Sequence, residues 1–158
     1  MKYTKGAIGR VFLIKFSDKD VFLKEIEKFA RKEKIKAATM IFLGALREGD
    51  LVTGPKKTVI PPEPNWVKFK GGWEIFGIGT ILANKKGPQI HIHGSLGKKK
   101  KVFTGCVRKD SKVFLVIEAV VFELKGVKAT KDIDPATGLN LLNIGAGLTR
   151  LHSDIVTV

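Results

Sequence analysis

The alternation of apolar and polar residues along the chain predicts a strand followed by one amphipathic helix. Residues 8–16, IGRVFLIKF, are rich in β-branched and aromatic residues, as strands are. In the next segment apolar residues recur on one helical face: Phe22, Ile26, Phe29 and Ala30. A helix is therefore predicted over about 18–33, with Ser17 or Asp18 as its cap. Its apolar stripe should lie on a sheet.

From Ile35 onward the pattern is that of strands joined by short turns. The run AATMIFLGALREGDLVTG is interrupted by Gly44, where we expect a bulge or a close backbone approach. Residues 54–72 hold four of the six prolines and predict a long loop with edge-strand fragments. Further strands follow in succession: WEIFGIGTILA, HIHGSLG, KVFTGCVRK and KVFLVIEAVVFELKG. Consecutive strands with short turns favour an antiparallel sheet.

The end of the chain, from residue 126, is less regular but still apolar. DPATG predicts a turn, and the apolar stretch after Gly138 suggests docking on the body or on a neighbouring subunit. Neither a repeat nor a linker is visible. We therefore expect a single α+β domain over 1–158, with a core at about 8–144 and an apolar tail at 145–158.

Composition indicates a soluble chain. Hydrophobic residues make up 44% of it, and no apolar run approaches the ~18 residues of a membrane-spanning helix. The start, MKYTKGAIGRVFLIKF, has neither the long apolar core nor the cleavage site of a secretory signal. We expect a cytoplasmic protein with no membrane partner.

The formal net charge of +14 admits two explanations. A strongly basic surface attracts polyanions such as nucleic acid. The excess is nearly all lysine, however, and lysine enrichment with a single glutamine also marks heat-adapted, thermophilic surfaces. The lysines that would meet phosphates are clustered in sequence: Lys56, Lys57, Lys85, Lys86, Lys98, Lys99, Lys100 and Lys101.

Candidate chemistry is concentrated in QIHIHGSLGKKKKVFTGCV, residues 89–107. Residues two apart in a strand share a face, so His91 and His93 should project together. A tight reversal centred between Lys99 and Lys100 would set His93 opposite Cys106, and His91 opposite Arg108. Two imidazoles and a thiolate on one face suit zinc with a fourth position open.

Other interpretations of these residues stay open. A longer loop would shift the register and turn Cys106 to the other face. A His-x-His pair is often only hydrogen-bonded, and a lone buried cysteine often only packs. Glu74 and Glu118 lie inside apolar runs, where a carboxylate is costly unless paired. Each is a candidate proton carrier or a solvent-facing residue.

Residues 8–144 resemble the plants-and-prokaryotes conserved (PPC) domain. The resemblance rests on six segments in matching order: FLGALRE (42–48), GGWEIFGIGTI (71–81), HIHGSLG (91–97), TGCV (104–107), IEAVV (117–121) and DPATGLNLL (134–142). It implies a mainly antiparallel sheet with one principal helix, assembled as a homotrimer. Its HxH strand matches His91 and His93, and Cys106 stands where the family usually has a third histidine. This exchange of one zinc ligand for another supports a metal site.

Two functions follow from these observations. The first is a trimeric module that binds DNA phosphates without reading sequence, as the family's association with AT-hooks implies. No Arg-Gly-Arg-Pro AT-hook core occurs in this chain. The second is a zinc-dependent enzyme or small-molecule site at His91, His93 and Cys106, with Glu74 or Glu118 moving a proton.

Overall fold

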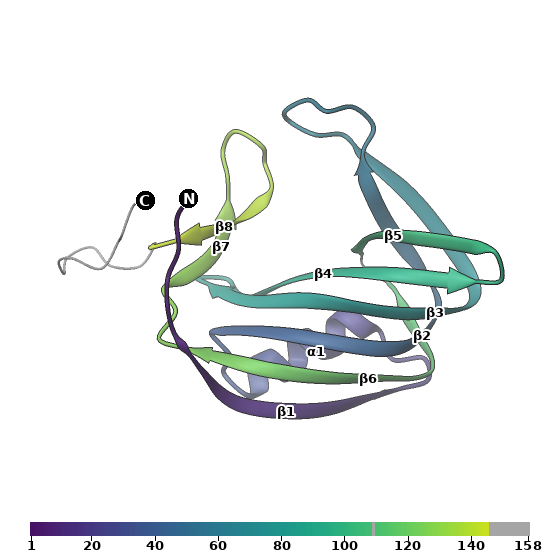
Figure 1. Cartoon of the computed structure of the whole chain (residues 1–158), viewed down its shortest axis with the longest axis horizontal. Coiled ribbons are helices and arrows are strands. Elements are labelled where there is room, and N and C mark those ends of the chain that lie inside the picture. The colour runs from purple at the N-terminus through teal and green to yellow at the C-terminus, as the bar shows by residue number, and fades with distance from the viewer. Residues whose placement is uncertain (109, 146–158) are drawn as a thin grey trace.

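A six-stranded antiparallel sheet carries one helix on one of its faces (Figure 1). The computed structural model describes residues 1–108 and 110–145. The sheet has the strand order β1-β6-β2-β3-β4-β5. Its strands are β1 (Ala7–Ser17), β2 (Ala37–Pro55), β3 (Pro64–Asn84), β4 (Gly87–Lys98), β5 (Lys101–Val107) and β6 (Lys112–Lys125). The predicted fold class, a mainly antiparallel sheet with a single helix, is confirmed.

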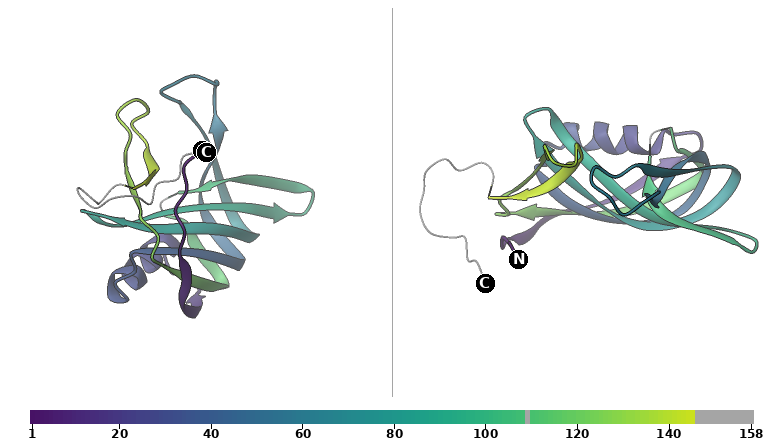
Figure 2. Two further views of the ribbon diagram at one scale, coloured as in Figure 1. Left: turned by 60° about the vertical axis from the view of Figure 1, so that its left-hand side comes forward. Right: turned by 90° about the horizontal axis from the view of Figure 1, so that it is seen from above.

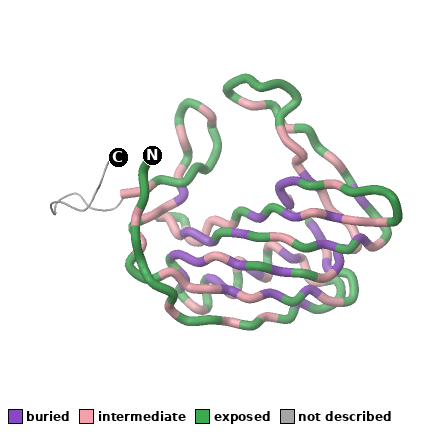
Figure 3. Tube along the Cα trace, viewed as in Figure 1, coloured by how far each residue is buried: buried purple, intermediate pink, exposed green. Residues whose placement is uncertain are grey.

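The helix α1 (Phe22–Lys32) lies behind the sheet in Figure 1 and along one side of it in Figure 2. Its stripe is buried as predicted, with Phe22, Ile26 and Ala30 each no more than 1% exposed. The ring of Phe22 contacts Phe16 of β1 and Phe42 of β2, with centroids 5.0 and 5.1 Å apart. Buried residues recur along the central strands of the sheet (Figure 3).

The predicted start and cap of the helix were wrong. Helix α1 begins at Phe22, and its N-cap residue, Val21, makes no side-chain capping bond. The Asp20 carboxylate accepts the Ser17 N–H and closes a turn before the helix. Asp18 accepts a hydrogen bond from Arg47 at 2.7 Å and is thereby held away from the helix terminus.

The proline-rich loop is shorter than predicted, because β2 and β3 extend into it as a hairpin. Val52 pairs with Trp66 and Pro55 with Pro64, so only residues 56–63 connect the two strands. Proline is tolerated here because strand ends need no ladder N–H. The close approach predicted at Gly44 is confirmed, since a Cβ there would lie 2.3 Å from the Val116 oxygen.

The apolar C-terminal segment contains a second, two-stranded sheet that sequence patterning did not predict. It consists of β7 (Ala129–Ile133) and β8 (Asn140–Ile144), joined through the predicted DPATG turn. In that turn the Asp134 carboxylate accepts the Thr137 N–H. Most of the tail proposed to dock, 146–158, lies outside the described residues. Within the described part of the chain, no helix has the length and apolar character needed to cross a bilayer.

Candidate metal centre

Strand β4 presents its two histidines together on the face that α1 leaves open. Ile92 between them is 1% exposed and belongs to the core, so the alternation of the strand turns His91 and His93 the other way. Their Nε2 atoms lie 3.2 Å apart, and the two rings meet edge to face. The predicted pair is confirmed as a geometric unit.

The β4–β5 turn sets the register that brings Cys106 to this pair. Lys98 pairs with Lys101, so the reversal is centred between Lys99 and Lys100, and His93 pairs with Cys106 as predicted. Lys99 takes the positive φ of 54° that the tight turn requires. At the other end of β5, the pairing with β4 ends at His93 and Cys106. Arg108 follows β5 and donates its backbone N–H to Asp50 instead of pairing with His91.

Strand β5 also pairs with β2, and this second contact buries the cysteine. Cys106 lies opposite Val52 and is 4% exposed. The approach depends on Gly105, because a Cβ there would lie 2.4 Å from the Val52 carbonyl oxygen. A glycine therefore precedes the cysteine for a steric reason.

The three side chains form a set that fits one metal ion. The ligand atoms of His91, His93 and Cys106 all lie within 4.8 Å of one another. Two ligands at the usual ~2.0–2.3 Å from a tetrahedral ion are separated by roughly 3.3–3.8 Å, so small side-chain movements suffice. Imidazole and thiolate are donors that zinc prefers, and three of them leave one position open.

Burial favours neutral imidazole at His91 and a protonated thiol at Cys106. Partial burial lowers the pKa of His91 to about 4, helped by the positive charges of Lys131 and Arg108 and by His93. Burial also raises the pKa of Cys106, against smaller opposing effects of Arg108 and Lys131. Neutral imidazole is the form that ligates metal, whereas the thiol must release its proton.

Lys131 is a neighbour that the sequence did not suggest. It lies on β7, is only 7% exposed, and is placed by a hydrogen bond from the Asn84 amide to its carbonyl at 2.7 Å. No local pattern could have revealed it, because its position depends on how the β7–β8 hairpin docks beside β3.

The two candidate carboxylates do not join the metal-binding set. Glu118 on β6 is separated from β4 by β2 and β3, a distance of roughly 14 Å across the sheet. Glu74 pairs with Gly97, four residues along β4 from His93, or roughly 13 Å away. Both are exposed.

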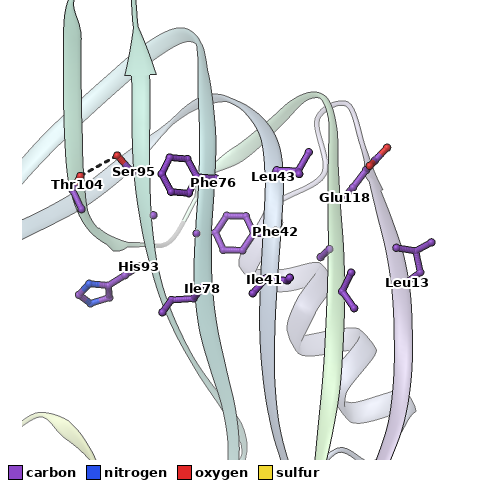
Figure 4. Close-up of a pocket in the computed structure, with 14 residues that line it drawn as sticks. Leu13, Ile41, Phe42, Leu43, Phe76, Ile78, His93, Ser95, Thr104 and Glu118 are labelled. Carbon is purple, nitrogen blue, oxygen red and sulfur yellow. Dashed lines mark hydrogen bonds between the residues drawn. The ribbon is translucent and has the colours of Figure 1, made fainter.

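The open face of the sheet next to His93 is strongly apolar. Figure 4 shows the side chains on this face, around a hollow of about 560 Å³ that has His93 and Glu118 on its border. Five of the lining side chains are exposed large hydrophobics: Leu13, Ile41, Leu43, Phe76 and Ile78. Contiguous exposed apolar surface of this kind marks an interaction site.

The lysines proposed to bind phosphate are distributed over three hairpin connections. Lys56 and Lys57 lie in the β2–β3 loop, and Lys85 and Lys86 in the β3–β4 turn. Lys98–Lys101 surround the β4–β5 turn. The last two groups lie at opposite ends of the 12-residue β4, roughly 35 Å apart.

Comparison with known proteins identifies relatives that match most of the chain. The family model of the Plants and Prokaryotes Conserved (PCC) domain matches residues 3–125. A metal-containing protein from Archaeoglobus fulgidus is 26% identical, with a TM-score of 0.78 over 89% of this chain and 98% of that one. A plant- and prokaryote-conserved (PPC) protein from Pyrococcus horikoshii has the same identity and TM-score, over 90% and 97%.

A more distant structure shows the same fold. A "putative dna binding protein" from Bacteroides thetaiotaomicron is 20% identical, with a TM-score of 0.72 over 91% of this chain and 98% of that one. No curated protein matches the chain.

Proposed function

The chain belongs to the Plants and Prokaryotes Conserved domain family, and from that premise we propose that it is a zinc-binding protein with a small-molecule site at His91, His93 and Cys106. The observation that supports the proposal most is the convergence of three ligand atoms within 4.8 Å on one face. The resemblance of the fold to the metal-containing protein from Archaeoglobus fulgidus supports it further.

Each of the three residues would have its own role in such a site. His91 and His93 would hold the ion through their Nε2 atoms, and the buried Cys106 thiolate would supply the one negative ligand. When bound, zinc supplies a Lewis acid with a free coordination position. The neutral state of His91 keeps its imidazole ready to ligate without first losing a proton.

A zinc titration tests the proposal directly. We expect His91→Ala and His93→Ala each to weaken zinc binding by at least roughly tenfold, because each removes one of three protein ligands. Ser95→Ala is the matched control on the same strand and should leave binding unchanged. Equal zinc affinity in all four proteins, measured by competition with a chelating dye, would contradict the site.

We also propose that the chain forms a homotrimer through its open sheet face. The family resemblance implies the trimer, and the exposed apolar side chains beside His93 supply a surface that a second copy would cover. The same contact would exclude water from one side of the metal site.

DNA binding is the second candidate function, and the net charge of +14 favours it. Lysines in three separate hairpin connections would meet phosphates as point charges, without reading bases. Non-specific binding of this kind has a Kd of ~10⁻⁴–10⁻⁶ M at physiological salt.

Salt dependence tests the DNA proposal. Retardation of unrelated duplexes should be similar, and log affinity should fall linearly with log salt, by about 0.9 for each phosphate contact. Replacing Lys99 and Lys100 by glutamine should reduce that slope by about two. A sequence preference that survives high salt would contradict non-specific binding.

A further inference from the structure

Two positive side chains beside the metal-binding set have no negative partner in the described part of the chain. Lys131 is 7% exposed, and Arg108 is half-buried with its Nε shielded from solvent and without a hydrogen-bond partner. Among residues 1–108 and 110–145, neither takes part in any of the ion pairs.

The cations converge from two different elements. Arg108 comes directly after β5, two residues beyond Cys106, and its backbone is fixed by the 2.9 Å bond to the Asp50 carbonyl. Lys131 comes from β7, where Asn84 holds its carbonyl. The same Asn84 side chain accepts a hydrogen bond from Gln89, two residues before His91 on β4. Arg108 and Lys131 are therefore carried by segments next to the metal ligands.

Burial of such an arrangement is unfavourable without an anion. A divalent ion would add two positive charges to those of Arg108 and Lys131, against the single negative charge of the Cys106 thiolate. Buried charges are normally paired, and a buried charge without a partner destabilises the fold. Guanidinium and ammonium groups near one another most often pair with carboxylate or phosphate.

We propose that Arg108 and Lys131 form a subsite for an oxyanion, which belongs to the small molecule that binds at the metal. This inference rests on the proposed zinc site and adds the chemical class of its ligand: a small molecule with a carboxylate or phosphate group. The arginine fork would take two of the oxyanion's oxygens, and the ammonium would neutralise its charge. The exposed histidines leave the site open to solvent on the side of β4.

Binding of two matched probes to the zinc-loaded full chain tests the subsite. Benzoate and phenyl phosphate share a ring and differ in the oxyanion, so the tighter of the two identifies the carboxylate or the phosphate class. We expect Lys131→Met and Arg108→Gln each to lower the affinity for the preferred probe by roughly 10- to 100-fold in a calorimetric titration, because each removes a charged hydrogen bond. Lys128→Met is the matched control, because it removes the same charge from an exposed lysine three residues away.

Thermal unfolding and zinc content, measured on the same samples, separate the possible outcomes. A lysine that binds an anion is not needed for folding, so Lys131→Met should keep or raise the midpoint of metal-free unfolding. Should that variant fail to fold, Arg108→Gln decides the question alone. Bound zinc with equal probe affinity in the wild type and both variants would overturn the subsite and leave the metal proposal standing. Absence of zinc from the wild type would overturn the metal proposal. Probe affinity would then be compared between the metal-free wild type and the two variants: weaker binding by the variants would support the subsite, and equal binding would overturn it.

Discussion

Cys106 is the residue whose chemistry distinguishes a metal centre from ordinary packing. It is 4% exposed, and burial raises the pKa of its thiol. A raised pKa means that the thiol keeps its proton at neutral pH until an ion displaces it. Zinc binding must therefore compete with a proton at this one ligand, whereas the pKa of about 4 leaves His91 neutral over the same range.

We predict a pH dependence of zinc affinity that originates in Cys106. Because one thiol proton is released on binding, apparent zinc affinity should fall about tenfold for each pH unit between pH 8.5 and 7. Cys106→His, which introduces the residue that the family usually has, should retain zinc and flatten the dependence in this window. Chelator competition at several pH values measures both. The same slope in wild type and Cys106→His would show that the thiol is not a ligand.

The alternative role for Cys106 is packing in the core, and the variant Cys106→Ser distinguishes it from metal binding. If Cys106 only packs, Cys106→Ser should lower the free energy of unfolding by about 1–3 kcal/mol, through the burial of a hydroxyl, and leave metal content at background. If it is a ligand, the same variant should lose most of its zinc affinity in addition. Urea unfolding of the metal-free chain and zinc content of the loaded chain separate the two.

Among the elements, those with one buried face could be predicted from the local alternation of apolar and polar residues. The helical stripe from Phe22 to Ala30 and the strand alternation around Ile92 are both found, since each reflects a single buried face. The cross-strand partner of His93 could also be predicted, because a two-residue turn determines register. The start of α1 could not, because Asp18 bonds to Arg47 in a distant strand.

The elements that sequence analysis missed depend on tertiary contacts. Sequence analysis did not reveal the looped end of the β2–β3 hairpin, because Pro55 and Pro64 lie there, at strand ends where the ladder needs no N–H. The place of the β7–β8 hairpin, and hence of Lys131, follows from contacts such as that between Asn84 and the Lys131 carbonyl. No pattern within residues 129–144 specifies this docking.

Gly44 provides a test of the pairing between β2 and β6. Its φ is +143°, and a Cβ would lie 2.3 Å from the Val116 oxygen and 2.7 Å from the Ile117 Cα. We predict that Gly44→Ala lowers the free energy of unfolding by about 2 kcal/mol or more, because backbone atoms cannot move aside locally.

Gly97→Ala is the control for that substitution, since no atom lies within 4 Å of a Cβ built there. It should change stability by no more than about 0.5 kcal/mol in a urea titration. Equal stability of the two variants would contradict the close packing of β2 on β6.

At the scale of the whole molecule, the open apolar face requires an explanation that the single chain does not give. Phe76 and Ile78 are 67% and 63% exposed on the face opposite α1. We predict a particle of about three times the 17.4 kDa chain mass in sedimentation. Ile78→Lys should convert it to monomer by placing a charge in the contact.

Val59→Lys is the matched control, because Val59 is 56% exposed in the β2–β3 loop and lies away from the open face. It should leave the assembly unchanged. A wild-type monomer at micromolar concentration would contradict the trimer, and a trimer that survives Ile78→Lys would place its interface elsewhere.

X-ray absorption at the zinc edge of the zinc-loaded protein, alongside its elemental analysis, tests whether His91, His93 and Cys106 together hold one ion. We predict one zinc per chain, with one sulfur ligand at about 2.3 Å and imidazole nitrogens at about 2.0–2.1 Å. Zinc at background level, or a zinc coordination sphere without sulfur, would contradict it.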